Sequence, residues 1–207
     1  MKINLTGNSS DSKFTPKVLT EGTQEARVSR IIDLGVQPPM NTKFGTDPKR
    51  QLLVQFELAD DTVEIKGETK PAFIGARINF VGGEKSKLTA LVRACGVDSD
   101  SVELKDILGS ALSVTIKNRE SNGNTYSNVV SFAPISARVA KTVPELVADS
   151  YIFSFDDPDV EIASKLGKGM RRVLEKAINY PGSEVEKLLG ESQNETKSDD
   201  SGSEDVI

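Results

Sequence analysis

The chain has 207 residues, of which 37% are hydrophobic and 5% aromatic, so part of it is expected to lie outside a packed core. It contains no histidine, which excludes His-based catalytic triads and the common His-containing zinc sites and argues against an enzyme. The last 17 residues hold six acids and one base, so this tail supplies the whole formal net charge of −5 and the remaining 190 residues are neutral overall.

The first part of the chain is predicted to be an arm followed by three strands. Residues 1–22 are polar and show no sustained hydrophobic period, so we expect a flexible arm, in which residues 14–19 could form a short strand. Apolar and polar residues then alternate, as in half-buried strands, over residues 24–36, 50–58 and 72–80. Arg30 interrupts the apolar face of the first stretch, which indicates a β-bulge or a strand end.

The middle of the chain predicts a helix and then a β-hairpin. Residues 84–94 carry apolar side chains three and four positions apart, as an amphipathic helix requires. Residues 110–134 alternate in polarity on both sides of Asn122-Gly123, a pair that tolerates the positive φ of a tight hairpin turn. Three strands, one helix and two strands form the order of an OB-fold, a five-stranded Greek-key barrel, although a mixed α+β sandwich would show the same pattern.

Beyond Pro134 the pattern becomes helical. Helices are predicted at residues 160–166, from residue 170 to about Tyr180, and at residues 183–189. They either pack on the barrel or form an arm for protein docking and self-association. The predicted organisation is a flexible arm at residues 1–22, an OB-fold domain at 23–140, a helical extension at 141–190 and a disordered acidic tail at 191–207.

Two motifs that could carry chemistry are better explained as ordinary surface. The segment Gly82–Ser86 resembles half of a phosphate-binding loop, but Glu84 stands where such a loop needs glycine and would repel phosphate. The acid pairs Asp60-Asp61 and Asp156-Asp157 lie in predicted turns without a third carboxylate nearby, which is a poor basis for a magnesium site. The sequence therefore predicts no catalytic residue, no metal site and no cofactor.

Aromatic and basic residues on the outer side of the predicted barrel fit single-stranded nucleic acid, whose bases stack on rings while cations contact the phosphates. In an OB-fold the binding face lies on the second and third strands, flanked by the loops between the first two and the last two strands. The predicted stacking residues are Phe73, Tyr126 and Phe44. The predicted phosphate-binding residues are Lys43, Lys49, Arg50, Arg77, Lys117 and Arg119. The alternative is that the rings cover the barrel ends and the cations are ordinary surface charge.

The acidic tail ends in two apolar residues, and three roles remain open for it. It could occupy a cationic groove when DNA is absent, it could be captured by a basic and partly apolar pocket on a partner, or it could simply keep the protein soluble. The tail residues predicted to bind a partner are Asp199, Asp200, Glu204, Asp205, Val206 and Ile207.

An ordered set of short motifs resembles a known family. The motifs are Asp33-Leu34-Gly35, Phe56-Glu57-Leu58, Glu84-Lys85-Ser86-Lys87-Leu88, Leu108-Gly109, and Asn124-Thr125-Tyr126-Ser127-Asn128 followed by Ser131 and Pro134. Over about residues 23–136 the set resembles the OB-fold single-stranded DNA-binding proteins of tailed phages. The resemblance implies coating of single-stranded DNA without sequence specificity during phage replication, recombination or repair, with an acidic tail that recruits replication or recombination enzymes. The tail departs from the family in ending with Val206-Ile207 rather than an aromatic residue.

The predicted function is therefore binding of single-stranded DNA without catalysis, aided by cooperative coating or homo-oligomerisation. A phage interaction or virion protein that uses the same barrel for protein contacts is the main alternative, and a metal-dependent enzyme is a third. The single cysteine fits a reducing cytosol, and the chain shows neither an apolar run of the ~20 residues that a membrane helix needs nor a secretory signal. The predicted location is the cytoplasm of the host cell.

Overall fold

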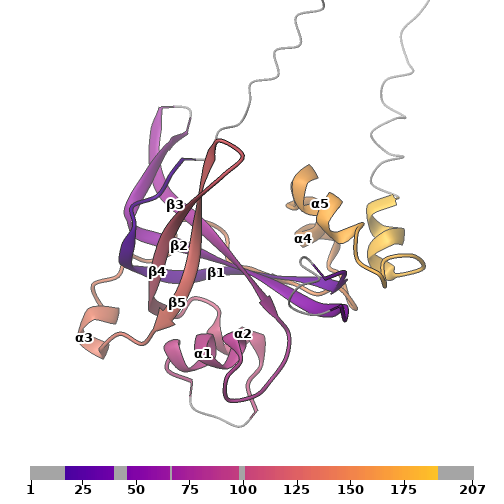
Figure 1. Ribbon diagram of the computed structural model, residues 1–207, viewed down its shortest axis with the longest axis horizontal. Coiled ribbons are helices and arrows are strands. Elements are labelled where there is room, and N and C mark those ends of the chain that lie inside the picture. The colour runs from indigo at the N-terminus through magenta and orange to yellow at the C-terminus, as the bar shows by residue number, and fades with distance from the viewer. Residues whose placement is uncertain (1–16, 40–45, 66, 98–100, 191–207) are drawn as a thin grey trace, which may run out of the picture.

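Five long antiparallel strands form a nearly closed barrel in the computed structural model, which describes residues 17–39, 46–65, 67–97 and 101–190 (Figure 1). The strands are β1 (Gly22–Gln37), β2 (Lys49–Ile65), β3 (Glu68–Asn79), β4 (Ala111–Ser121) and β5 (Asn124–Ala133). Their order in the sheet is β3-β2-β1-β4-β5, and β3 also contacts β5, which nearly closes the barrel. The prediction of a mainly β protein built on such a barrel is confirmed.

The first strand holds both halves of the barrel together because it bends. It pairs with β2 from Ala26 to Gln37, but with β4 only from Gly22 to Arg27. The register with β2 shifts between Val28 and Arg30, which confirms a bulge at the position where the polarity pattern was interrupted. A bulge increases the local bend and twist of a strand, so one long strand can serve two neighbours that diverge.

Two short helices close the lower end of the barrel in Figure 1, α1 (Lys87–Ala94) and α2 (Leu104–Ile107). Leu91 of α1 and Ile107 of α2 are fully buried in the main core. The helix predicted from residue 84 begins at Lys87, because the Ser86 hydroxyl accepts a hydrogen bond from the Thr89 N–H (3.0 Å) and so caps the first turn.

The second strand is longer than predicted. It continues to Ile65 through a bulge between Glu57 and Thr62, so Asp60-Asp61 lies within a strand and not in a turn. The Asp61 carboxylate accepts hydrogen bonds from the Thr20 N–H (2.9 Å) and the Gln24 amide (3.0 Å). Residues 17–21, which the sequence assigned to the flexible arm, therefore lie against the barrel.

The chain after the barrel folds back onto it and adds a second core. Its elements are α3 (Ala137–Ala140), β6 (Tyr151–Phe153), α4 (Val160–Ser164), α5 (Lys168–Leu174) and a last helix at residues 184–190. Strand β6, which was not predicted, pairs in parallel with β1 beyond the point where β4 ends. The second core is formed by Ile32 and Leu34 of β1 together with Phe153, Phe155, Leu174, Val185 and Leu189. Helices are thus present at all three predicted places and pack on the barrel, but the second was predicted to continue to about Tyr180 and ends at Leu174.

Glycine is required at one position beside the second core. Gly35 has φ +68°, and a Cβ atom there would lie 2.7 Å from the Phe155 ring. Such a conformation and such a close approach suit only glycine.

Within the described part of the chain, no helix is long and apolar enough to cross a membrane.

The single cysteine offers a test of how tightly α1 packs. Burial raises the pKa of the Cys95 thiol to about 12, although a hydrogen bond with Ser110 acts in the opposite direction. Because the thiolate is the reactive form, we expect native Cys95 to react with a disulfide reagent much more slowly than free cysteine at mildly alkaline pH, and to react at the ordinary rate in denaturant. A native rate equal to the denatured rate would show that α1 opens readily.

Candidate nucleic-acid interface

The C-terminal extension covers much of the outer surface of β1 and β2. The Arg27 guanidinium donates a hydrogen bond to the backbone oxygen of Pro144 (2.8 Å). The buried Glu57 carboxylate accepts hydrogen bonds from the N–H groups of Val147 (2.8 Å) and Ala148 (3.1 Å). The outer face of β2, one of the two strands on which binding was predicted, is therefore largely occupied by the protein's own chain.

The outer face of β3 remains open. Along this strand, buried residues at 72, 74, 76 and 78 alternate with exposed residues at 73, 75, 77 and 79. Phe73 and Arg77 thus point to the same outer side, separated by Gly75. In Figure 1 the second half of β3 emerges between the β4–β5 hairpin and the C-terminal helices. This strand places Phe73 and Arg77, both predicted site residues, on an accessible surface.

The β4–β5 hairpin groups three further predicted residues on one face. Asn122 and Gly123 have φ +51° and +74°, so the predicted hairpin turn is confirmed. The register pairs Arg119 with Tyr126 directly across the two strands, and Lys117 lies two residues from Arg119 on the same face. Tyr126 is 45% exposed. Among the described residues, Lys117 and Arg119 form no ion pair, so their charges are available to a ligand.

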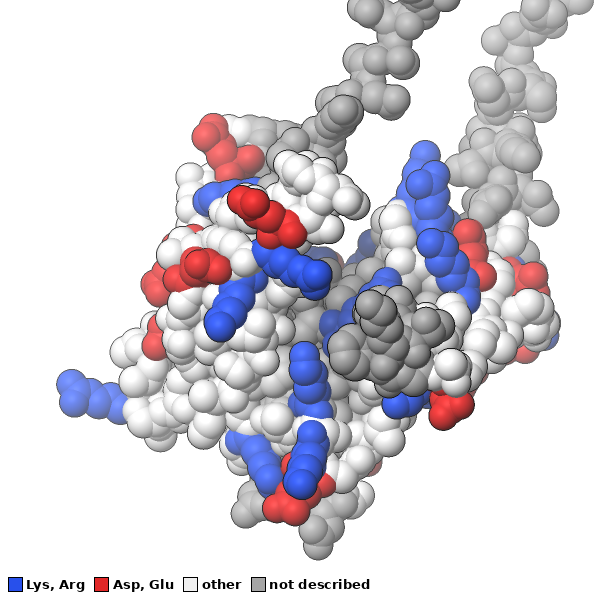
Figure 2. Space-filling view, in the orientation of Figure 1, with Lys and Arg blue, Asp and Glu red and all other residues white. Residues whose placement is uncertain are grey.

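The surface beside this hairpin is concave. Figure 2 shows a hollow between the β4–β5 hairpin and the C-terminal helices, with Lys and Arg side chains on both sides of it. Cations that surround a concave surface attract anionic ligands more strongly than isolated ones do.

Phe73 is less available for stacking than Tyr126. The Arg30 guanidinium lies 5.3 Å from the centre of the Phe73 ring and 5.2 Å from that of Tyr151. The Lys165 ammonium lies 6.0 Å from the centre of the same Tyr151 ring. Alternating rings and cations thus connect β3 with the extension, and they stabilise each other through cation–π attraction. Arg30 occupies one face of the Phe73 ring, which leaves the opposite face and edge for a ligand.

Arg50 has a structural role that its sequence position did not reveal. Its guanidinium is paired with the buried Asp33 carboxylate, to which Nε donates at 3.0 Å, and with Asp156 of the extension at 2.7 Å. The hydrogen bonds from Arg50 to Asp33 raise the pKa of the guanidinium well above its ordinary value, despite the opposing effect of burial, and Asp156 adds to the increase. Two acids already neutralise this cation, so it is poorly placed to bind phosphate.

The remaining predicted residues are distributed as follows. Lys49 is exposed at the start of β2, opposite Gln37 at the end of β1. Lys43 and Phe44 lie outside the described residues, and so does the tail from residue 191 to residue 207. Within the described ranges, no three His, Cys, Asp or Glu residues are grouped as a metal site would require.

A separate cavity of about 520 Å³ lies between α1, α2 and the loop after β3. Phe80, Leu88, Val92 and Leu104 form part of its apolar lining, and Arg93 and Glu103 add charge. The sequence did not single this cavity out, because its walls come from elements whose packing a linear pattern does not show.

Comparison of the sequence with protein-family models and with curated proteins finds no match.

Proposed function

We propose that the protein binds single-stranded DNA, without sequence specificity, along the hollow beside the β4–β5 hairpin. One observation carries this proposal: the exposed Tyr126 ring lies directly opposite Arg119 and on the same outer face as Lys117. A ring on which a base can stack, next to cations that can hold the adjoining phosphates, is the combination that sequence-tolerant binding of single strands requires. In this proposal Phe73 and Arg77 extend the surface along β3, Lys49 contributes at its margin, and Arg50 is not a phosphate ligand.

The strand order supports an OB-fold of Greek-key type. Strands β3, β2 and β1 are sequential neighbours, β4 joins the far side of β1, and β5 returns next to β3, with two helices between β3 and β4. OB-folds bind oligonucleotides on the face to which β3 belongs. Together with the resemblance to tailed-phage proteins, this supports a role in phage DNA replication, recombination or repair in the host cytoplasm. The acidic tail would then recruit the enzymes that act on the coated DNA.

The proposal is tested by fluorescence anisotropy with a labelled oligo-dT titrated at several salt concentrations. Replacing Lys117 and Arg119 together with glutamine removes two proposed phosphate contacts. Each contact contributes about 0.7 to the slope of log K against log salt, so at about 0.1 M salt we expect affinity to fall roughly 25-fold and the slope to fall by about 1.4.

The matched control removes two exposed charges elsewhere. Arg138 in α3 and Lys141 just after it are exposed, and Figure 1 shows α3 on the opposite side of the barrel strands from α4 and α5, so R138Q/K141Q should leave binding nearly unchanged. If both double variants lost affinity for oligo-dT equally, the loss would come from the change in net charge and not from contacts at the hairpin. A wild-type protein that shows no salt-dependent binding to oligo-dT would overturn the proposal.

The cavity between α1 and α2 favours a second candidate function, in which the barrel binds other proteins in a phage particle or complex. Phe80 and Val81 are large apolar side chains that are 44% and 50% exposed at this end of the barrel. Exposed apolar residues next to a cavity are typical of protein-docking sites. This alternative predicts no salt-dependent DNA binding by the wild-type protein, so the same titration separates the two functions.

A further inference from the structure

One segment of the extension, residues 165–176, carries an excess of positive charge, although the extension as a whole holds seven bases and nine acids. Residues 165–176 contain five cations and one acid. Two of the cations have structural partners: Lys165 donates to Asp149 (3.0 Å), and Arg171 donates to the backbone oxygen of Leu166 (3.0 Å) after the end of α4. The other three are Lys168, Arg172 and Lys176. Within the described part of the chain, they take part in none of the ion pairs.

Two of these cations, Lys168 and Arg172, lie on α5, and Lys176 lies in the turn that follows it. They follow each other at intervals of four residues, and all three are exposed, whereas Leu174 and Ala177 are buried in the second core. Like charges four residues apart destabilise an isolated helix. Lys168 is the first residue of α5, where the helix dipole disfavours a cation, whereas Arg172 in the last turn is favourably placed. Helix stability alone therefore does not explain the run of cations.

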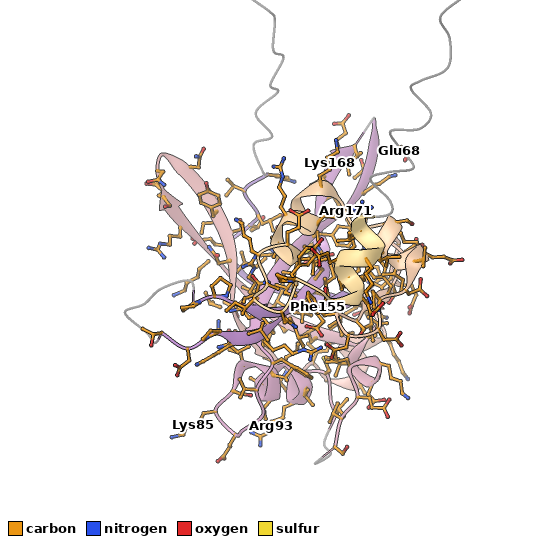
Figure 3. All side chains as sticks on the ribbon, turned by 90° about the vertical axis from the view of Figure 1, so that its right-hand side faces the viewer. Glu68, Lys85, Arg93, Phe155, Lys168 and Arg171 are labelled. Atoms are coloured by element: carbon orange, nitrogen blue, oxygen red, sulfur yellow. The ribbon has the colours of Figure 1, made fainter. Side chains whose placement is uncertain are left out.

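The position of α5 is fixed by contacts with the end of β1. The Gln37 amide donates to the backbone oxygen of Val173 (3.2 Å), and the Ile178 N–H donates to the backbone oxygen of Val36 (2.7 Å). Figure 3 shows Lys168 at the upper end of the molecule, the end at which Figure 1 shows the tips of both β-hairpins. Figure 2 shows Lys and Arg side chains on the helical side of the hollow. The helix thus stands across the hollow from the β4–β5 hairpin.

We propose that Lys168 and Arg172 on α5 and Lys176 in the turn after it form a second cationic wall for the same DNA strand, and that they bind successive phosphates. This inference rests on the proposed function and extends its site to the extension. Lys168 and Arg172 are four residues apart on the helix and so about 6 Å apart along its axis, a spacing that suits neighbouring phosphates of an extended strand. The strand would cross the open face of β3 between two basic walls, and its phosphates would relieve the repulsion along α5.

The test is the triple variant K168Q/R172Q/K176Q of the full chain, measured with the same labelled oligo-dT. Loss of the three contacts should weaken binding at least tenfold, and by up to roughly a hundredfold at about 0.1 M salt, with a salt slope smaller by about 2. The melting temperature should change little, because loss of the repulsion between like charges offsets loss of the favourable position of Arg172 in the last turn. A purely structural role would instead lower the melting temperature and leave the salt slope unchanged.

The control triple variant R138Q/K141Q/K187Q removes three exposed charges from other regions and should bind almost as the wild type does. If K117Q/R119Q weakens binding and K168Q/R172Q/K176Q does not, the inference that these three residues bind DNA is wrong and the proposed function stands. If the two triple variants weaken binding equally, the effect belongs to net charge and the inference is overturned. If the wild type does not bind oligo-dT, the proposed function itself fails.

Discussion

Replacing Asp33 with alanine is expected to lower the free energy of unfolding by about 3 kcal/mol, as is typical when one partner of a buried ion pair is removed. The Asp33 side chain is only 8% exposed and neutralises Arg50, which is itself largely covered. Asp33 also accepts a hydrogen bond from the buried N–H of Gly35 (3.0 Å). The variant therefore leaves a cation without its main partner and a buried donor without an acceptor. Denaturant unfolding of the two proteins measures the difference.

Two variants at the same site show which interaction is responsible. Asp33→Asn keeps an acceptor for the Gly35 N–H and loses the charge, so its stability should lie between the wild type and the alanine variant. Asp156→Ala removes the second carboxylate that pairs with Arg50. The Asp156 side chain is 65% exposed, and exposed ion pairs contribute at most about 1 kcal/mol to stability. If Asp33→Ala were as mild as Asp156→Ala, the burial of the Asp33–Arg50 pair between β1 and β2 would add nothing to stability.

Replacing Tyr126 with alanine is expected to weaken oligo-dT binding by about 5-fold to 150-fold, the loss of about 1–3 kcal/mol that accompanies removal of one stacked base contact. The ring is 45% exposed and makes no side-chain hydrogen bond among the described residues, so the melting temperature should change little. The salt slope should also stay nearly constant, since no cation is lost. Anisotropy titrations at several salt concentrations measure both quantities.

The conservative variant Tyr126→Phe keeps the aromatic face and should bind almost as the wild type does. Phe73→Ala should have a smaller effect than Tyr126→Ala, because Arg30 already lies against the Phe73 ring. Loss of binding in Tyr126→Phe would mean that the hydroxyl group, not the ring, contacts DNA. Unchanged binding in Tyr126→Ala would remove the residue on which the proposed site is centred.

The barrel could be predicted from the sequence because its signals are local. The Asn122-Gly123 turn and the alternating residues on both sides of it suffice for β4 and β5, and the interruption at Arg30 marked the bulge in β1. The end of β2 was predicted too early, because adjacent aspartates favour turns. In the structure Asp61 remains within the strand, since its carboxylate is hydrogen-bonded by Thr20 and Gln24, far away in the sequence.

The site was predicted less completely, because its boundaries come from distant segments. Arg50 looked like an ordinary basic residue at the start of a strand, but its partners Asp33 and Asp156 are 17 and 106 residues away. The extension covers β2 and leaves β3 open, which no local pattern indicates. One signal was present: Tyr151, Phe153 and Phe155 alternate with polar or smaller residues, as a strand does, and they mark β6 and the second core.

The pairing of β6 with β1 affects how the protein is made. During synthesis, β1 and β2 leave the ribosome early. The edge of β1 that pairs with β6, and the apolar side chains of Ile32 and Leu34 on β1 and Leu53 on β2, stay uncovered until residues 151–189 follow. An exposed strand edge next to an apolar surface invites aggregation and proteolysis. A chain that stopped after residue 140 is therefore expected to aggregate, because nothing would cover this edge of β1 and its apolar neighbours.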